Sequence, residues 1–411
     1  MAGIVLSVNA GSSSLKVSLF APTFEGPKHL ATCTVDAINT DQPSFTSSVK
    51  DINDEEKNVR RVKDHDEALR YILNHLFRTT TSAEDLTHVC HRVVHGGDYQ
   101  KRQPINEDSL HHLESLIELA PLHNKSSTAL IRATLKQLPN ATSIAYFDTT
   151  FHRSLPRHIY TLPLDRKLAD QCSLRKYGFH GISYSFILRN VAEFLQKPES
   201  DMNLIIMHLG SGASICCVQN GKSLDTSMGL TPLAGLPGAT RSGDIDPTTI
   251  LHYIRISHAS VDTAEEVLNK QSGWKALTGT TSFGDVAKRS NDETKLAFDL
   301  FVDRILNFVG AYYLKLGGQV DALVFAGGIG EKSAELREAV SNQCQCLGFV
   351  FDKDRNQRPE GKAPVKALCN MERQGGEGDR KKRVLVCETD EQFEMAFQCM
   401  QDRDLYEKGD R

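Results

Sequence analysis

The sequence lacks any apolar run that approaches the roughly 18 residues of a membrane-spanning helix. Its apolar stretch at 3–8 is too short for a signal peptide and has no basic flank. The 48 basic and 52 acidic side chains leave a net charge of only −4, so no strong field draws the chain to nucleic acid or anionic lipid. We therefore expect a cytoplasmic protein that binds neither membrane nor nucleic acid.

Cysteine motifs are also missing, although the chain has ten cysteines. No CxxC pair occurs, which argues against a zinc ribbon or a thioredoxin-like redox motif. Without an export signal we expect reduced thiols, buried as small apolar groups. Apolar residues are abundant. They occupy 40% of the 411 positions, which is enough for the cores of two domains.

The first half of the chain reads as a hairpin, a strand that ends in glycines, and a strand that ends in an acidic residue. Alternating and β-branched runs predict these elements over 4–8 with 15–20, over 89–94 before Gly96-Gly97, and over 143–147 before Asp148. Helical spacing marks 67–77, 110–119 and 126–138, and the polar stretch 39–66 is expected to be loop and edge.

The second half repeats this order. The hairpin is predicted over 204–209 and 214–218, the glycine-ended strand over 321–325, the acid-ended strand over 383–387, and helices over 262–268, 294–316 and 333–342. We therefore expect an α/β protein of two similar domains, spanning 1–150 with 393–411 and 151–392. The segment 355–383 is rich in charge and glycine and is expected to be a solvated polar insertion.

Three segments of the first half combine polar chemistry with a turn or a strand. The turn from Asn9 to Lys16 gathers an amide, hydroxyls and a cation that could bind phosphate, although P-loop spacing is absent and a plain polar hairpin turn is the alternative. Arg92 lies inside an apolar strand and needs an anion, either a ligand or a structural carboxylate. Asp148 follows a strand, as a site residue or as a helix N-cap. Asp148 and Glu391 are the candidate carboxylates for Mg²⁺.

Three segments of the second half carry further candidates. His180 is bracketed by Gly178 and Gly181, which suggests close approach of another group, although a lone histidine is more often structural. Arg241 lies in a stretch dense in turn-forming residues. The glycines of 327–330 follow a strand and would let backbone approach a nucleotide, which alone is a weak signal.

Taken together, these segments resemble the acetate/propionate/butyrate kinase family. The resemblance runs from Val5 to about Phe393 and is strongest at 8–16 (VNAGSSSLK) and 225–247 (DTSMGLTPLAGLPGATRSGDIDP). The shorter motifs HRVVHGG, APLHN, FDTTFH, YGFHGIS, HLGSGAS and AGGIGE follow in the family's order. The chain looks like a eukaryotic-type member.

The resemblance implies two duplicated ribonuclease-H-like (actin-like ATPase) domains, with a mixed sheet in each and an active-site cleft between them. It implies a homodimer that uses ATP/ADP with Mg²⁺, for which Mn²⁺ could substitute. The implied reaction is reversible transfer of the γ-phosphoryl group of ATP to acetate, directly and in line, giving acetyl phosphate and ADP. Because acetate is already ionised at pH 7, such catalysis needs positioning and charge neutralisation more than proton transfer.

The resemblance also assigns roles to single residues. The implied catalytic residues are Asp148, Arg92, His180 and Arg241. The implied substrate-binding residues are Arg92, Val94, Leu122, Phe179 and Pro232. The residues implied to bind nucleotide and phosphate are Asn9, Ser12, Ser14, Lys16, His208, Gly210, Ser211, Gly212, Gly327, Gly328, Ile329 and Gly330. The metal would be held by Asn9, Glu391 and Asp148.

The chain departs from the family's pattern at several positions, which keeps alternatives open. Ser211 stands where Asn is usual, Tyr184 where His is usual, and Lys125 and Ser127 where Pro and Asn are usual. The alternatives are a propionate or butyrate kinase, a pyrophosphate-dependent acetate kinase, and a sugar kinase with Asp148 as base. A non-catalytic ATP-gated module of the Hsp70/actin type is a further alternative, but Arg92 and Arg241 together argue against it.

Overall fold

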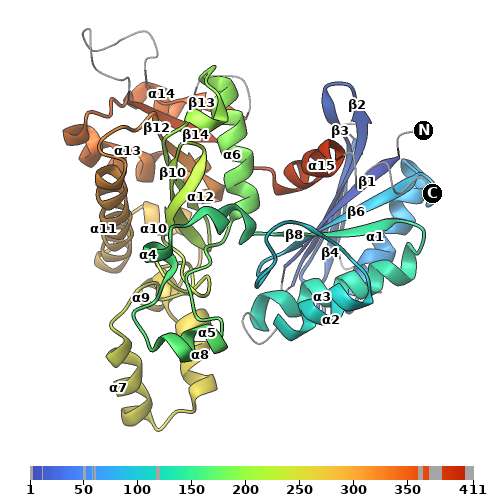
Figure 1. Cartoon of the computed structure of the whole chain (residues 1–411), viewed down its shortest axis with the longest axis horizontal. Coiled ribbons are helices and arrows are strands. Elements are labelled where there is room, and N and C mark those ends of the chain that lie inside the picture. The colour runs from blue at the N-terminus through green and yellow to red at the C-terminus, as the bar shows by residue number, and fades with distance from the viewer. Residues whose placement is uncertain are drawn as a thin grey trace. The chain divides into compact units, whose positions relative to one another are not determined.

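A computed structural model describes residues 3–11, 13–49, 52–57, 59, 62–116, 121–359, 364–369 and 382–402. The chain forms two compact units (Figure 1). Unit 1 comprises Met1–Thr150, Gly181–Ser183 and Asp390–Arg411, and unit 2 comprises Phe151–His180 and Tyr184–Thr389. Over the described ranges, none of the helices combines the length and apolar character needed to span a membrane.

Unit 1 is built on an eight-stranded sheet with the order β5-β4-β3-β2-β1-β6-β8-β7. Its strands are β1 (Ile4–Ala10), β2 (Leu15–Thr23), β3 (Gly26–Asp36), β4 (Ser44–Val49), β5 (Ile52–Lys57), β6 (Leu86–Val93), β7 (Gln103–Pro104) and β8 (Thr142–Phe147). Neighbouring strands from β5 to β1 pair antiparallel, whereas β1, β6 and β8 are parallel to one another. The carboxyl ends of these three parallel strands therefore lie at one edge of the sheet.

Helices cover both faces of this sheet, because its strands alternate apolar side chains between the faces. On one face, Leu6 and Val8 pack in a core with Leu69 of α1 (His65–Thr79) and Leu130 of α3 (Pro121–Gln137). On the other face, Val5 packs with apolar residues of α15 (Glu391–Gln401). The remaining helix of unit 1, α2 (Glu107–Ser115), ends earlier than the predicted 110–119, and 117–120 lie outside the described residues.

Unit 2 is built on a six-stranded sheet with the order β11-β10-β9-β12-β14-β13. Its strands are β9 (Leu204–Leu209), β10 (Ala213–Gln219), β11 (Lys222–Thr226), β12 (Ala322–Ala326), β13 (Val365–Ala367) and β14 (Arg383–Cys387). Strands β9, β12 and β14 are parallel, and β10 returns antiparallel to β9. The order β11-β10-β9-β12-β14 matches β3-β2-β1-β6-β8 of unit 1, which confirms the predicted duplication.

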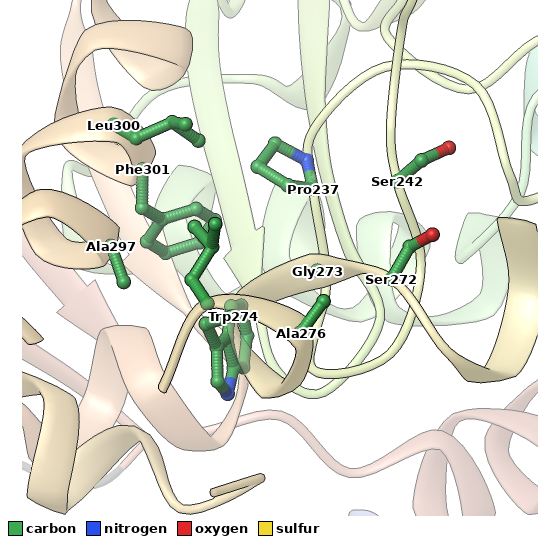
Figure 2. Close-up of a pocket in the computed structure, with 10 residues that line it drawn as sticks. Pro237, Ser242, Ser272, Gly273, Trp274, Ala276, Ala297, Leu300 and Phe301 are labelled. Carbon is green, nitrogen blue, oxygen red and sulfur yellow. The ribbon is translucent and has the colours of Figure 1, made fainter. Parts of the chain in front are cut away.

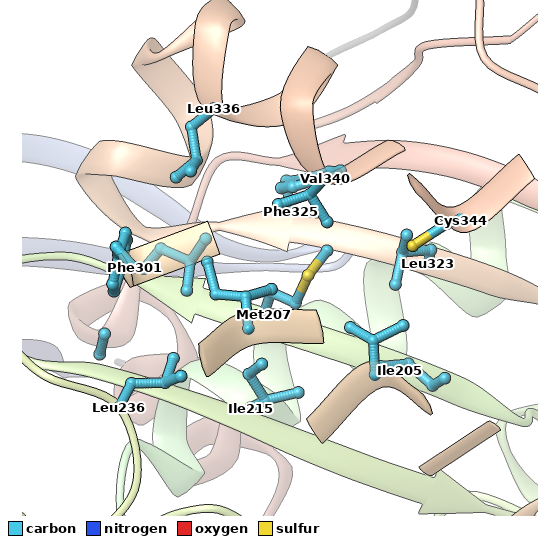
Figure 3. Packing of buried hydrophobic residues seen from close by; sticks show 14 of the residues in the cluster. Ile205, Met207, Ile215, Leu236, Phe301, Leu323, Phe325, Leu336, Val340 and Cys344 are labelled. Carbon is cyan, nitrogen blue, oxygen red and sulfur yellow. The ribbon is translucent and has the colours of Figure 1, made fainter. Parts of the chain in front are cut away.

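Apolar side chains of the sheet in unit 2 pack against a layer of helices. Met207, Ile215 and Phe325 meet Phe301 and Leu336 in this core (Figure 3). The helices of this part of the chain are α4 (Arg157–Tyr160), α5 (Arg166–Gln171), α6 (Gly181–Phe194), α7 (Pro247–Ser257), α8 (Val261–Lys270), α9 (Gly273–Thr278), α10 (Phe283–Ala287), α11 (Asp292–Lys315), α12 (Gly327–Lys332), α13 (Ala334–Cys344) and α14 (Lys353–Gln357). Short 3-10 turns are η2 (Thr150–Ser154), η3 (Glu199–Asp201) and η4 (Gln345–Leu347).

In each unit, a helix that comes later in the chain than the last parallel strand belongs wholly or mostly to the other unit. Helix α6 comes after β8, yet from Tyr184 onward it is part of unit 2. Helix α15 comes after β14, yet it packs on the sheet of unit 1. Helices α4 and α5, which lie between β8 and α6 in the chain, also belong to unit 2.

The stretch 39–66 was expected to be loop and edge, and its centre forms two strands, of which β5 is the edge strand of the sheet. Strands β4 and β5 occupy 44–49 and 52–57 and extend the sheet of unit 1. Polar residues dominate these strands, but Phe45 is buried and β4 pairs with β3 over six residues. Pairing with a neighbouring strand sets the register of β4 and β5, which their polar sequence does not predict.

The expected solvated insertion at 355–383 was wrong where the structure describes it. Residues 353–357 form α14, with Asn356 buried, and β13 pairs antiparallel with β14. Leu368 is fully buried in the core of unit 2. Residues 360–363 and 370–381 lie outside the described residues.

Candidate functional site

The functional candidates of unit 1 meet at the carboxyl edge of the parallel strands. Asn9 lies near the end of β1, Arg92 near the end of β6, and Asp148 directly follows β8. Arg92 donates two hydrogen bonds to Asp148, from Nε to Oδ1 at 3.1 Å and from Nη2 to Oδ2 at 2.8 Å. Asp148 is 1% exposed and Arg92 17%, so this is a largely buried, two-pronged ion pair. The structural carboxylate considered for Arg92 is therefore Asp148, itself a candidate site residue.

The carboxylate of Glu391 completes the charge arrangement around Arg92. Burial lowers the pKa of Arg92, but the charges of Asp148 and Glu391 outweigh this and raise the pKa above its ordinary value. Glu391 is the first residue of α15, and its Oε1 accepts a hydrogen bond of 2.6 Å from Ser183 Oγ. Arg92 is thus a permanent cation between carboxylates.

Gln392 holds the start of α15 on the β1–β2 hairpin. Its Nε2 donates to the carbonyls of Ser7 and Lys16, both at 3.1 Å, and its backbone carbonyl accepts from Ser7 Oγ at 2.8 Å. These contacts fix Glu391 next to the strand that carries Asn9. Sequence reasoning missed both residues, because Gln392 belongs to no charged or glycine-rich motif and because His180, not Ser183, carried the signal of the motif YGFHGIS.

The hairpin turn of unit 1 is closed by a hydrogen bond from Gly11 N to the carbonyl of Ser14 at 2.8 Å. Ser14 is half-buried and Lys16 is exposed, so both side chains are accessible to a ligand. Ser12 lies outside the described residues, as does the side chain of Leu122. Val94 is half-buried beside His95, whose backbone is bonded on both sides by the amide of Asn124 (3.1 and 2.9 Å).

In unit 2, His180 is held in an unusual backbone conformation at the start of α6. Its φ of +59° is in the left-handed region, which a non-glycine residue seldom adopts and which is often found at functional sites. The ring of His180 lies 4.2 Å from the ring of His208, centroid to centroid. Its Nδ1 is 2.8 Å from Ser214 Oγ. The structure therefore brings together two sequence-predicted residues, His180 and His208.

The residue before His180 is anchored by a histidine that sequence reasoning missed. His152 is fully buried, and its Nε2 is 2.9 Å from the carbonyl of Phe179 while its Nδ1 is 2.8 Å from Ser223 Oγ. Burial lowers the pKa of His152 to about 4, so the ring is neutral. Phe179 itself is buried, as is Pro232.

Arg241 lies against the glycine turn of the second hairpin, at Gly210-Ser211-Gly212. A Cβ added to Gly212 would lie 2.8 Å from Arg241 Nη1, so glycine is what lets the guanidinium approach. The carbonyl of Ser211 accepts from Ala239 N at 2.9 Å, while the Ser211 side chain is exposed. Burial lowers the pKa of Arg241.

The loop that carries Arg241 is held by the amino end of α9. Backbone amides of α9 and its N-cap donate to three successive loop carbonyls, namely Trp274 to Gly238 (3.2 Å), Lys275 to Ala239 (3.0 Å) and Ser272 to Thr240 (2.9 Å). A cavity of about 230 Å³ lies behind this contact, lined by Pro237 and Ser242 of the loop and by Trp274 and Phe301 (Figure 2). The loop therefore depends on α9 for its shape.

The segment Gly327–Gly330, which follows β12 as expected, forms the first turn of α12. Gly327 has a φ of +72°, and a Cβ there would lie 2.7 Å from the carbonyl of Leu209. Gly328 is exposed, with open space around its Cα. The backbone at Gly328 is thus accessible, while Gly327 is needed for the close packing of α12 on β9.

The candidate residues fall into two sets, one in each unit. Unit 1 contributes Asn9, Ser14, Lys16, Arg92, Val94, Asp148 and Glu391, and unit 2 contributes Phe179, His180, His208, Gly210, Ser211, Gly212, Pro232, Arg241 and 327–330. Within the described ranges, no group of three or more His, Cys, Asp or Glu side chains could hold a metal ion. A hard cation would instead need one or two carboxylates plus oxygens of a ligand.

Comparison with known proteins gives a consistent result. Residues 4–396 match the Acetokinase family. The chain is 49% identical over 417 residues to a protein of Emericella nidulans named probable acetate kinase, covering 98% of both chains. Its structure is similar to the crystal structure of Porphyromonas gingivalis acetate kinase (TM-score 0.85, 31% identity, 97% and 99% of the two chains). It is also similar to a propionate kinase from Francisella tularensis (TM-score 0.86, 32% identity, 96% and 98%).

Proposed function

Because the chain belongs to the acetokinase family, we propose that it transfers the γ-phosphoryl group of ATP to acetate, reversibly, giving acetyl phosphate and ADP. Its two duplicated α/β units are those of the actin-like ATPase fold. One observation carries the proposal within the structure: a charged arginine, Arg92, stands with Asp148, Asn9 and Glu391 at the carboxyl ends of parallel strands. That edge of an α/β sheet is where ligands usually bind.

Charge neutralisation is the main chemical task in this reaction. Acetate is ionised at neutral pH, and its oxygen attacks a phosphorus atom that also carries negative charge. No general base is required, because the nucleophile has no proton to lose. Arg92 suits this task, since its raised pKa keeps it cationic while Asp148 fixes the plane of the guanidinium.

The residues of unit 2 are proposed to hold the transferring phosphoryl group. Arg241 supplies a second guanidinium, and His180 a ring nitrogen, as donors to phosphoryl oxygens. The phosphates are proposed to be bound by Asn9, Ser12, Ser14 and Lys16 of unit 1 and by His208, Gly210, Ser211 and Gly212 of unit 2. The adenosine is proposed to be bound by Gly327, Gly328, Ile329 and Gly330. The open space at Gly328 and the two glycines that flank Ser211 support backbone approach to a ligand.

The donor set of unit 1 fits Mg²⁺. Asn9, Asp148 and Glu391 offer hard oxygen ligands, and each carboxylate oxygen keeps a lone pair beyond its hydrogen bond to Arg92 or Ser183. When bound, the ion would neutralise and orient the phosphate chain. Mn²⁺, with similar ligand preferences, is expected to substitute.

The acyl group is proposed to sit against Val94, Leu122, Phe179 and Pro232. Val94 of unit 1 and Phe179 and Pro232 of unit 2 are apolar, as contact with a methyl group requires. Propionate is the second candidate substrate, because one similar structure is named a propionate kinase. Discrimination by one methylene is worth about 1–3 kcal/mol in such a pocket.

The deciding experiment is an assay of the purified protein in both directions. Acetyl phosphate breakdown is measured with ADP and, separately, with orthophosphate, each with Mg²⁺ and after chelation. The forward reaction is compared with acetate, propionate, butyrate and glucose. We expect Mg²⁺-dependent turnover with ADP and a preference for acetate. Turnover with orthophosphate alone would replace ATP by pyrophosphate as donor, and phosphorylation of glucose would overturn the carboxylate acceptor.

We also propose a cytoplasmic homodimer. Two apolar side chains of neighbouring helices, Ile256 of α7 and Val261 of α8, are 79% and 72% exposed. Exposed apolar side chains that gather in one region often mark a protein interface. Light scattering coupled to gel filtration should give a mass twice that of the chain, and a monomer across the accessible concentration range would contradict this.

A further inference from the structure

Ser214 bridges His180 to a buried tyrosine on the same helix. Its Oγ lies 2.8 Å from His180 Nδ1 and 2.5 Å from the hydroxyl of Tyr184. Tyr184 follows His180 by one helical turn, so both side chains reach the same point on β10. Ser214 and Tyr184 are both fully buried. The three groups form a continuous chain of hydrogen bonds, Tyr184–Ser214–His180.

Counting protons along this chain leaves one arrangement in which every group is satisfied. Burial raises the pKa of Tyr184 well above its ordinary value, so the phenol keeps its proton. Among the described residues, Ser214 Oγ is the hydrogen-bond partner of that phenol. If Tyr184 donates to Ser214, the serine proton goes to His180 Nδ1, which must then be an unprotonated acceptor.

The reverse arrangement is worse. If His180 carried its proton on Nδ1 and donated to Ser214, the serine would either donate to the tyrosine oxygen or accept from the tyrosine as well. The proton of Tyr184 in the first case, or that of Ser214 in the second, would then be buried without an acceptor among the described residues, which costs free energy that the arrangement with Ser214 donating to Nδ1 avoids.

We propose that Tyr184 and Ser214 are positioning residues that hold His180 in the neutral tautomer with its proton on Nε2. His180 is then a hydrogen-bond donor through Nε2 rather than through Nδ1. The proposal rests on the proposed function only where it assigns that donor to a phosphoryl oxygen. It gives a role to Tyr184, which departs from the family's usual histidine: among the described residues Ser214 is the acceptor for the phenol proton, and this sets the direction of the hydrogen bonds.

The surroundings of the relay make the tautomer consequential. His208 is paired directly with Ser214 across the β9–β10 hairpin, and its ring lies 4.2 Å from that of His180. The left-handed backbone of His180 and the relay together fix both the place of the ring and the identity of its protonated nitrogen. A donor with a fixed proton needs no reorganisation when charge develops on a bound oxygen.

The first test reads the tautomer directly, in the protein without substrates. Histidine labelled with ¹⁵N gives separate ring-nitrogen shifts for protonated and unprotonated positions, and a His180→Gln variant assigns the His180 signals. At about pH 8, where an ordinary imidazole is neutral, we expect Nδ1 unprotonated and Nε2 protonated. A wild-type protein with its proton on Nδ1 would overturn the proposal.

The second test removes the single hydroxyl that drives the relay. In Tyr184→Phe, Ser214 loses the donor that orients and polarises its hydroxyl, so its hydrogen bond to Nδ1 should weaken and the His180 spectrum should show a mixture of tautomers. kcat should fall about 10-fold or more, while the KM values for acetate and ATP stay within about twofold. Ser214→Ala should disturb both the spectrum and kcat at least as much.

The control is Tyr312→Phe, which removes another buried phenol hydroxyl of unit 2. Among the described residues, that hydroxyl has no hydrogen-bond partner, so its loss should leave both the His180 spectrum and kcat unchanged. Unchanged His180 shifts together with unchanged kcat in Tyr184→Phe would refute the relay. Because the spectrum needs no substrate, a protein with the expected tautomer but no kinase activity would refute the proposed function alone.

Discussion

The two units share a strand order but stabilise their candidate arginines in different ways. Arg92 of unit 1 is part of a strand and is locked to Asp148, and neighbouring carboxylates raise its pKa. Arg241 of unit 2 lies on a loop whose backbone is bonded to α9, and burial lowers its pKa. Duplication of the sheet thus fixes where strand ends lie, but each unit has its own means of holding a cation there.

The difference has an energetic meaning. In unit 1 the arginine is built into the fold, because Asp148 is almost completely buried and depends on Arg92 for its charge partner. In unit 2 the arginine lies on a loop bonded to α9, one of the helices between β11 and β12, whereas the equivalent interval of unit 1, between β3 and β6, contains β4, β5 and α1. Loss of either guanidinium should harm catalysis, but only one loss should harm folding.

The largest expected effect comes from Arg92→Ala and Arg241→Ala. Each should lower kcat by about 10²–10³, as loss of a charge-stabilising contact does. Arg92→Ala should also cost about 3–5 kcal/mol of stability, because it leaves Asp148 buried and unpaired. Kinetics and urea unfolding of both variants check this. Equal stabilities would break the comparison between the two arginines, and activity above about a tenth of wild type would remove that arginine from the proposed site.

A smaller effect is expected at the support of the Arg241 loop. Gly273 has a φ of +67°, and a Cβ there would lie 2.0 Å from the carbonyl of Gly238. Gly273→Ala should destabilise the protein by about 1–3 kcal/mol and lower kcat by displacing Arg241. The single tryptophan, Trp274, is adjacent, so its fluorescence should report the change.

Gly279→Ala is the matched control at the other end of α9. Its φ of +79° imposes similar backbone strain, but nothing lies within 4 Å of the added Cβ. This variant should lose some stability and keep its kcat. If both variants lost kcat equally, the loop would not depend on the contact with Gly273.

A smaller effect again is expected on the pH dependence of stability, from one buried histidine in each unit. Burial lowers the pKa of His91 to about 3 and that of His152 to about 4. In the unfolded chain both titrate near 6.5, so the unfolded state binds the protons first. Their stabilising contribution is complete above about pH 6.5 and is lost as the pH falls, at up to ~1.4 kcal/mol per pH unit for each.

Urea unfolding between about pH 7 and pH 5 measures this slope. His91→Gln and His152→Gln should each reduce this slope by the contribution of about one proton, up to ~1.4 kcal/mol per pH unit. Exposed His111→Gln serves as the control and should leave the slope unchanged. A wild-type stability that does not decline over this range would contradict both assignments.

The smallest effect is expected from the proposed acyl pocket. Val94→Ala removes two methyl groups' worth of bulk from a half-buried side chain and should shift the acetate-to-propionate preference toward propionate by about 1 kcal/mol, near fivefold. Ratios of kcat/KM for the two acids measure it. An unchanged ratio would take Val94 out of the pocket.

Sequence patterns predicted the fold well where a strand carries its own signal. The two hairpins and the four parallel strands that flank them have apolar, β-branched runs bounded by glycine or acid, and all six regions form as expected. The family motifs likewise pointed to Arg92, Asp148 and His180 from the sequence alone. These motifs are dense in residues with unusual conformational or charge requirements.

The rest could not be predicted, because it depends on partners distant in the sequence. Strand β4 forms because it can pair with the edge of β3, rather than because its own residues strongly favour a strand. The hydrogen bonds of Gln392 join α15 to Ser7 of β1, and those of Ser214 join the start of α6 to the β9–β10 hairpin. Serine and glutamine occur everywhere in the chain, so only the folded arrangement distinguishes these few.

The exchange of helices between the units has a consequence for biosynthesis. The sheet face of unit 1 around Val5 and Phe20 is covered by α15, which the ribosome makes long after the strands themselves. While unit 2 is being translated, that face remains an exposed apolar surface to which chaperones can bind. A chain that ends just before α15 would contain almost the entire fold and still expose this apolar surface. Such a chain is expected to aggregate or to be degraded rather than to function in part.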